Sequence, residues 1–149
     1  MALVYFDASA FVKLVTEEPG SELAAQLWDG CDAALASRLA YPEVRAALAA
    51  AARNHDLNER DLDAAEQAWD EYWAATRPVE LTVAVEQRAG QLARDHALRG
   101  ADAVHLASAL AVGDRELIVA VWARRLHAGA QDAGLRVAPA SRGSGGSRW

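Results

Sequence analysis

Residues 3–10 read LVYFDASA, and this stretch decides the fold. The first four residues are apolar and rich in β-formers, and the run is too short for a helix, so we expect a buried strand. Asp7 follows this strand directly, and Ser9 is placed to cap a helix that runs to about Thr16. A carboxylate behind four buried apolar residues is costly unless it is paired or bound to a metal ion. Asp7 is therefore the first candidate functional residue.

The rest of the chain alternates short apolar runs with helical patterns. We expect further strands over 32–35, 78–81, 117–121 and 135–137, and helices over 21–28, 42–54, 58–73, 82–96, 102–112 and 124–130. This alternation predicts an α/β fold with a central, mostly parallel sheet flanked by helices. No internal repeat is visible, so we expect one domain over residues 1–140 and a loose Gly/Ser/Arg-rich tail over 141–149.

The amino-acid composition indicates in which cellular compartment the protein works and which kinds of partner it can bind. Cys31 is the only cysteine, which excludes an internal disulfide and a thiolate metal site and favours a reducing cytoplasm. No apolar segment is long enough to span a bilayer, so no membrane partner is expected. The net charge of −6 argues against broad, charge-driven binding of nucleic acid. It does not exclude a nuclease, because an acidic site becomes attractive to phosphate once it binds Mg²⁺.

Three acids lie where a parallel α/β sheet forms its sites, at strand ends and in the first turns of helices. They are Asp7, Glu43 just after Pro42, and Asp102 at the start of its helix. Converging carboxylates suit Mg²⁺ or Mn²⁺, which prefer oxygen ligands. Taken singly, Glu43 and Asp102 are better explained as acids that stabilise helix N-termini by about 0.3–1 kcal/mol.

Four motifs occur in order along nearly the whole chain, from about residue 3 to residue 138. They are FDASA at 6–10, AYPEV at 40–44, LRGADAVHLA at 98–107 and VWARRL at 121–126, of which the third is the most specific. With these motifs the chain resembles the PIN-domain ribonucleases, and among them the VapC toxins of bacterial toxin–antitoxin pairs. The resemblance implies a PIN-like α/β/α sandwich.

The resemblance also implies a chemistry and a set of partners. Asp7, Glu43 and Asp102 would bind the catalytic Mg²⁺ or Mn²⁺, and an RNA phosphodiester would be hydrolysed by a water that the ion activates. Ser9 would support the site through a hydrogen bond to Asp7 or to a bound water, although a simple helix cap explains it equally well. The expected partners are a cognate antitoxin, an RNA substrate such as tRNA or rRNA, and a second copy in a homodimer.

The chain departs from the family pattern at Ala123, where an acid usually follows the fourth strand. Asp114, Glu116 and Asp132 are the nearest acids, but each is expected too far from the strand end to replace it. Either three acids and water suffice to hold the ion, or Ala123 marks an inactivated form. We expect weaker occupancy of any second metal ion and lower activity than in an aspartate form.

Four arginines flank the predicted site in sequence: Arg45, Arg99, Arg124 and Arg125. Any of them is a candidate for contact with the RNA backbone, with Arg124 the first to test, and the alternative for each is ordinary solvated surface charge.

Two further features have a structural interpretation and a functional one. His105 lies one helical turn after Asp102 and is expected to be a satisfied buried residue rather than part of the site. Trp69, Tyr72 and Trp73 are spaced as on one helical face, which favours core packing, with a groove or dimer surface as the alternative.

Two other functions compete with the nuclease. A catalytically impaired PIN scaffold that binds RNA or antitoxin without cleaving is motivated by Ala123. A phosphatase of the haloacid-dehalogenase type is disfavoured, because that family needs a second acid where Ser9 stands and a late lysine, whereas Lys13 is the sole lysine.

Overall fold

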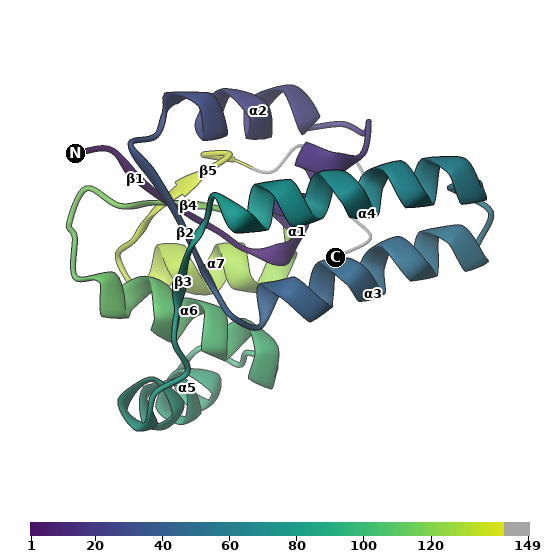
Figure 1. The fold of residues 1–149 in the computed structure, drawn as a ribbon. Helices are drawn as coiled ribbons and strands as arrows, with labels where there is room; N and C mark the ends of the chain where they lie inside the picture. The colour runs from purple at the N-terminus through teal and green to yellow at the C-terminus, as the bar shows by residue number, and fades with distance from the viewer. Residues whose placement is uncertain (142–149) are drawn as a thin grey trace.

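The computed structural model describes residues 1–141 and consists of five strands and seven helices in this range (Figure 1). The elements are β1 (Leu3–Phe6), α1 (Ala8–Val15), α2 (Ser21–Gly30), β2 (Ala33–Ser37), α3 (Ala40–Arg53), α4 (Glu59–Ala74), β3 (Arg77–Val79), α5 (Val83–Asp95), α6 (Gly100–Val112), β4 (Ile118–Ala120), α7 (Arg124–Asp132) and β5 (Arg136–Ala138). The tail predicted over 141–149 lies outside the described residues, apart from its first residue.

The five strands form one parallel sheet in the order β3-β2-β1-β4-β5. Strand β1 is central, with Val4 opposite Ala34 of β2 on one side and Ile118 of β4 on the other. The chain adds strands first on one side of β1 and then on the other, so the carboxyl end of β1 is the topological switch point at which such sheets bind ligands.

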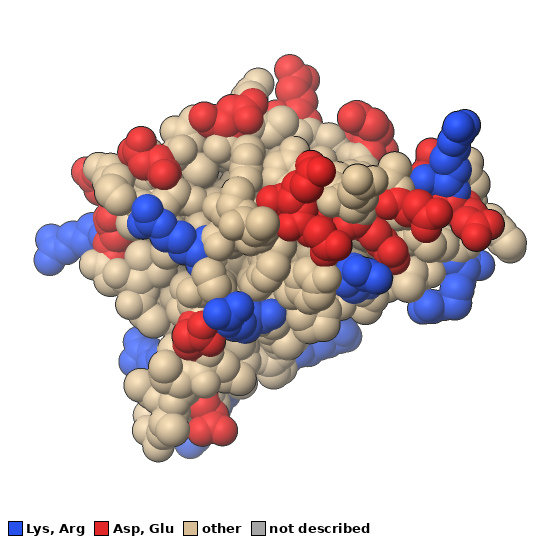
Figure 2. Space-filling view, in the orientation of Figure 1, with Lys and Arg blue, Asp and Glu red and all other residues tan. Residues whose placement is uncertain are grey.

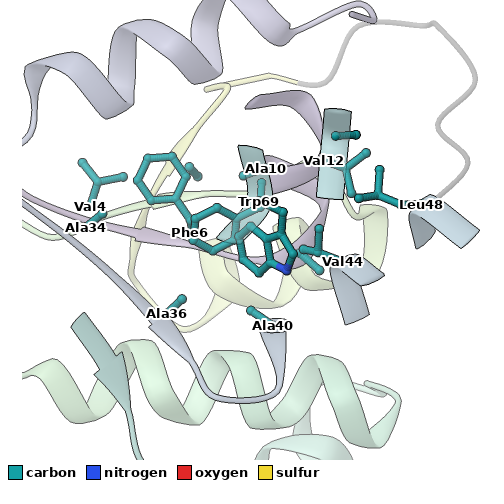
Figure 3. Close-up of a cluster of buried hydrophobic side chains, with 14 residues drawn as sticks. Val4, Phe6, Ala10, Val12, Ala34, Ala36, Ala40, Val44, Leu48 and Trp69 are labelled. Atoms are coloured by element: carbon teal, nitrogen blue, oxygen red, sulfur yellow. The ribbon is translucent and has the colours of Figure 1, made fainter. Parts of the chain in front are cut away.

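Alternate residues of β1 enter two separate cores because successive side chains of a strand point to opposite faces. Phe6 packs with α1, α2, α3 and α4, and Figure 3 shows it beside Trp69. Tyr5 packs with α5, α6 and α7 on the other face, among residues such as Leu106 and Leu126. The prediction of an α/β/α sandwich is confirmed, and the sheet is parallel throughout.

The aromatic cluster belongs to the first core. Trp69 is fully buried, and its ring lies 4.7 Å from that of Phe11, centroid to centroid. Tyr72 and Trp73 are half-buried at the rim of the same core, where Tyr72 packs edge-on against Trp28 at 4.9 Å. The core interpretation is therefore confirmed for Trp69.

Two helix starts are wrong, and the others agree with the sequence patterns to within about two residues. Pro42 is the third residue of α3 rather than the first, because the helix already begins at Ala40. Asn58 and Thr82 cap α4 and α5 as predicted, each accepting a backbone N–H with its side-chain oxygen. The cap of α1 is Asp7 rather than Ser9, because the extended backbone of Asp7 makes Ala8 the first helical residue. Among residues 1–141, no helix has both the length and the apolar character required to cross a membrane.

Candidate active site

Asp7 ends β1 and begins α1, which puts its carboxylate at the switch point of the sheet. The side chain is nearly inaccessible, with 3% of the residue exposed. Its Oδ1 accepts hydrogen bonds from the Ser9 hydroxyl at 2.6 Å and from the Ala10 backbone N–H at 3.0 Å. Burial nevertheless raises the pKa of Asp7 to about 6, because these bonds and the neighbouring His105 only partly offset the desolvation of the charge.

Ser9 connects Asp7 to the segment that follows β4. Its hydroxyl donates to Asp7 and accepts the backbone N–H groups of Trp122 at 2.9 Å and Ala123 at 3.2 Å. One donated and two accepted bonds use the whole capacity of a hydroxyl. The predicted hydrogen bond to Asp7 is therefore confirmed, and the alternative of a simple helix cap is wrong.

Glu43 enters the site from the first turn of α3, and its side chain is 29% exposed. Its Oε1 lies 2.5 Å from Nε2 of His105, a residue of α6 with 2% exposure. The other ring nitrogen of His105 lies 2.7 Å from the Tyr5 hydroxyl, which in turn accepts the Ser37 backbone N–H at 3.1 Å. His105 is thus a satisfied buried residue, as predicted, and it also contacts a candidate site residue.

Asp102 completes the acidic group from the first turn of α6. Burial raises the pKa of this carboxyl and the charge of Glu43 adds to the effect, although His105, Arg99 and Arg125 act in the opposite direction. Burial lowers the pKa of His105, but the hydrogen bond to Glu43 and the charges of the three acids outweigh it, so this pKa is raised overall. The charges of all three carboxylates therefore act on His105, and Glu43 is the one that contacts it.

The three acids offer the carboxylate oxygens that a hard divalent cation prefers. Glu43 raises the pKa values of both Asp7 and Asp102, so the acids repel one another as charged groups, and a cation would relieve that repulsion. Within residues 1–141, no three side chains of the metal-binding types stand together in an arrangement that could hold an ion. One oxygen of Glu43 is engaged by His105. The metal role of the three acids therefore stays a prediction.

Ala123 lies at the N-terminus of α7, next to the site, and offers only its backbone. It caps α7 without any side-chain hydrogen bond, and its N–H is bound by Ser9. Asp114 and Glu116 precede β4, which runs parallel to β1, so they lie at the opposite edge of the sheet from Asp7. Asp132 lies at the far end of α7. None of these three acids replaces the missing side chain.

The four candidate arginines have different surroundings. Arg99 and Arg125 are exposed, and each lies near enough to Asp102 to lower its pKa. Arg45 is paired with Glu66 of α4 at 3.4 Å, and Arg124 is exposed at the start of α7. Figure 2 shows acidic side chains gathered over α4 and single, separated basic side chains on this face. RNA contact by these arginines stays a prediction, with Arg99 and Arg125 the nearest to the acids.

The contact between Glu43 and the Tyr5–His105 pair was not expected from sequence. The available signals were a hydroxyl within an otherwise apolar strand and a histidine three residues after Asp102. Both indicate a buried polar group that needs a partner, but neither identifies Glu43.

Sequence comparison assigns the family. The profile of the PIN domain matches residues 4–119. Ribonuclease VapC45 of Mycobacterium tuberculosis strain CDC 1551 / Oshkosh and Ribonuclease VapC49 of strain ATCC 25618 / H37Rv are each 78% identical over 140 residues, which cover 94% of this chain and 97% of each relative. The protein therefore belongs to the PIN-domain family and, within it, to the VapC ribonucleases.

Solved structures agree on the fold. VapC20 of Mycobacterium tuberculosis, described as a toxin that cleaves the Sarcin-Ricin loop, superimposes with a TM-score of 0.65 at 18% identity, covering 94% of this chain and 99% of its own. A toxin-antitoxin complex from Klebsiella pneumoniae contains a chain with the same TM-score and identity, covering 95% of this chain and 99% of its own. These identities are low, so the two structures support the fold alone.

Proposed function

We propose that this protein is the toxin of a toxin–antitoxin pair and a Mg²⁺- or Mn²⁺-dependent endoribonuclease that acts in the cytoplasm. The observation that carries the proposal is the buried Asp7 at the switch point of the sheet, together with Glu43 and Asp102, whose charges act with that of Asp7 on the same buried His105. The ribonuclease names of relatives that are 78% identical over nearly the whole chain support the reaction class.

In this proposal Asp7, Glu43 and Asp102 hold the divalent ion. The chemistry that such an ion supplies is polarisation of the attacking water and neutralisation of charge that develops on the phosphate. Ser9 fixes the orientation of the Asp7 carboxylate through its 2.6 Å hydrogen bond. Arg99 and Arg125 lie beside Asp102 and contact the RNA backbone, which also offsets part of the repulsion between phosphate and the acids.

The absence of an acid at position 123 does not favour the impaired scaffold. The chain keeps the other three acids, and Ser9 binds the backbone N–H of Ala123, which keeps this segment next to Asp7. We expect the reaction to proceed with three carboxylates, more slowly than with an added fourth.

The proposed role as a toxin also implies an antitoxin, an RNA substrate and a second copy of the chain as partners. A toxin–antitoxin complex is among the structures that share the fold, which supports an antitoxin encoded elsewhere as the regulator of this protein. We propose a structured RNA as substrate, with tRNA and rRNA as the first candidates, and a homodimer as the assembled form.

The test is RNA cleavage by the purified, antitoxin-free protein. Structured cellular RNAs would be incubated with the wild type, Asp7→Asn and Ala123→Asp in Mg²⁺ or Mn²⁺ and then in chelator. Asp63→Asn is the matched control, because it makes the same substitution at an exposed position of α4. We expect discrete cleavage that requires metal, persists in the control and is lost in Asp7→Asn. Cleavage by Ala123→Asp alone would favour the impaired scaffold, and no cleavage by any variant would contradict the nuclease.

A further inference from the structure

A buried chain of hydrogen bonds starts at the backbone of β2 and ends on Glu43. The Ser37 N–H contacts the Tyr5 hydroxyl at 3.1 Å, this hydroxyl contacts Nδ1 of His105 at 2.7 Å, and Nε2 of His105 contacts Glu43 at 2.5 Å. Tyr5 is fully buried and His105 is 2% exposed, so neither side chain can exchange these partners for bulk water.

The chemistry of the groups determines which atom donates at each link. A backbone N–H only donates, so the Tyr5 oxygen accepts from Ser37 and has one proton of its own to give. At the other end, the ionised Glu43 carboxylate only accepts, so the proton of the neutral His105 ring lies on Nε2 and is donated to Glu43. Nδ1 of this tautomer is an acceptor, and the Tyr5 hydroxyl donates to it.

The donation to Glu43 does not depend on the charge of the ring. If His105 carries a second proton, Nδ1 becomes a donor to Tyr5, and Nε2 still donates to Glu43. The hydrogen bond from Nε2 to Glu43 is therefore kept in both the neutral and the protonated ring. This bond follows from the arrangement of the atoms and not from the titration of the histidine.

We propose that Tyr5 and His105 are positioning residues that hold the Glu43 carboxylate at the carboxyl end of the sheet for a divalent cation, an inference that rests on the proposed function. Glu43 is the more exposed partner, at 29% for its side chain against 3% for His105, and a glutamate side chain has several rotatable bonds. Fixing one oxygen on His105 leaves the other for the ion and removes rotational freedom before binding. Hydrogen bonds that orient a metal-binding carboxylate typically contribute about 10–100-fold in metal affinity.

The chain supplies a matched control in Ser108, one turn after His105 on α6. Its hydroxyl is buried and makes no hydrogen bond among the described residues. Ser108→Ala therefore removes a neighbouring buried hydroxyl and leaves every bond to Glu43 in place. Tyr5→Phe removes a hydroxyl of the same kind that lies within the chain of bonds.

The experiment measures Mn²⁺ affinity by titration calorimetry together with the NMR resonance of the His105 Nε2–H. His105→Leu deletes the donor, and His105→Gln replaces it with an amide N–H of similar reach. We expect His105→Leu and Tyr5→Phe to weaken Mn²⁺ binding by about tenfold or more. His105→Gln should keep most of the affinity, and Ser108→Ala should match the wild type. The Nε2–H signal should lie downfield in the wild type and in Ser108→Ala, and broaden in Tyr5→Phe.

The alternative outcomes are separable. If His105→Leu and Tyr5→Phe bind Mn²⁺ like the wild type while Asp7→Asn does not bind it, the positioning role is wrong and the proposed function stands. If Ser108→Ala loses as much affinity as Tyr5→Phe, the effect is general loosening of the core and the positioning role is again wrong. If the wild type itself binds no Mn²⁺, the proposed function is overturned, and this inference with it.

Discussion

Asp7→Asn is expected to stabilise the metal-free protein at neutral pH. Burial raises the pKa of Asp7 from 3.8 to about 6, so its ionised form is destabilised in the native state relative to the unfolded chain. Each pKa unit corresponds to about 1.36 kcal/mol, so ionisation of Asp7 costs about 3 kcal/mol of stability at pH 7. Asparagine avoids this cost, and its Oδ1 can accept the same two bonds from Ser9 and Ala10.

The sign of the pH dependence follows from the raised pKa. Below about pH 4 the carboxyl is protonated in both states, so ionisation costs nothing. The cost grows as pH rises, because the unfolded chain loses this proton first, and it is fully present above about pH 6. The difference in Tm between Asp7→Asn and the wild type should therefore be small at pH 4 and reach roughly 6–12 °C at pH 8.

The assay is thermal unfolding followed by circular dichroism in chelator at pH 4, 6 and 8, with Asp63→Asn as the exposed control. A Tm difference for Asp7→Asn that does not change with pH, or a destabilised variant at pH 8, would refute the argument that burial of this charge limits stability. Addition of Mn²⁺ at about a thousandfold excess over its Kd should then reverse the order, because a ligand at that excess stabilises by about 4.1 kcal/mol, which exceeds the cost of ionising Asp7, and only the wild type is expected to bind it well.

Three further predictions concern the surroundings of Asp7. Ser9→Ala leaves two backbone N–H groups without a partner and the Asp7 carboxylate with one hydrogen bond fewer. It should lower the free energy of unfolding by about 1–3 kcal/mol in urea, whereas Ser9→Thr keeps the hydroxyl and should lose less. Ala123→Asp should tighten Mn²⁺ binding in calorimetry and speed RNA cleavage; equal affinity and rate would show that this position does not face the ion. Arg99→Ala and Arg125→Ala should each weaken RNA binding and reduce the slope of log K against log salt concentration by about 0.7–0.9. An unchanged slope would show that the arginine makes no contact with an RNA phosphate.

Much of the fold was predictable because strand and helix patterns alternate clearly. The run before Asp7 and the Asn58 and Thr82 caps led to correctly placed elements, since each depends on residues close in sequence. The cap of α1 was assigned to the wrong residue because aspartate and serine both cap helices and stand two residues apart. Only the exact end of β1 decides between them, and patterns locate element ends poorly.

Part of the candidate site was also predictable, and part was not. Asp7, Glu43 and Asp102 were selected because they stand at strand ends or in first turns, and the structure does put charges of all three near His105. The bond from His105 to Glu43 joins residues 62 apart in sequence on helices of different layers. Periodicity reports which face of a helix is buried, but it does not report which helices meet at the edge of a sheet.

The two-core arrangement makes the spacing of the candidate site acids depend on the packing of both faces of the sheet. Glu43 belongs to α3, which enters the core on one face of the sheet through Val44 and Leu48 and packs there on α1 and α4, whereas Asp102 belongs to α6, which enters the core on the other face through Leu106. The spacing between the two acids is therefore set by how closely each helical layer approaches β1 and β2. Protein interiors resist compression and pass strain to their neighbours. A conservative change in either core, such as Leu106→Val, can thus alter the spacing between Glu43 and Asp102, and with it the activity, while the molecule stays folded.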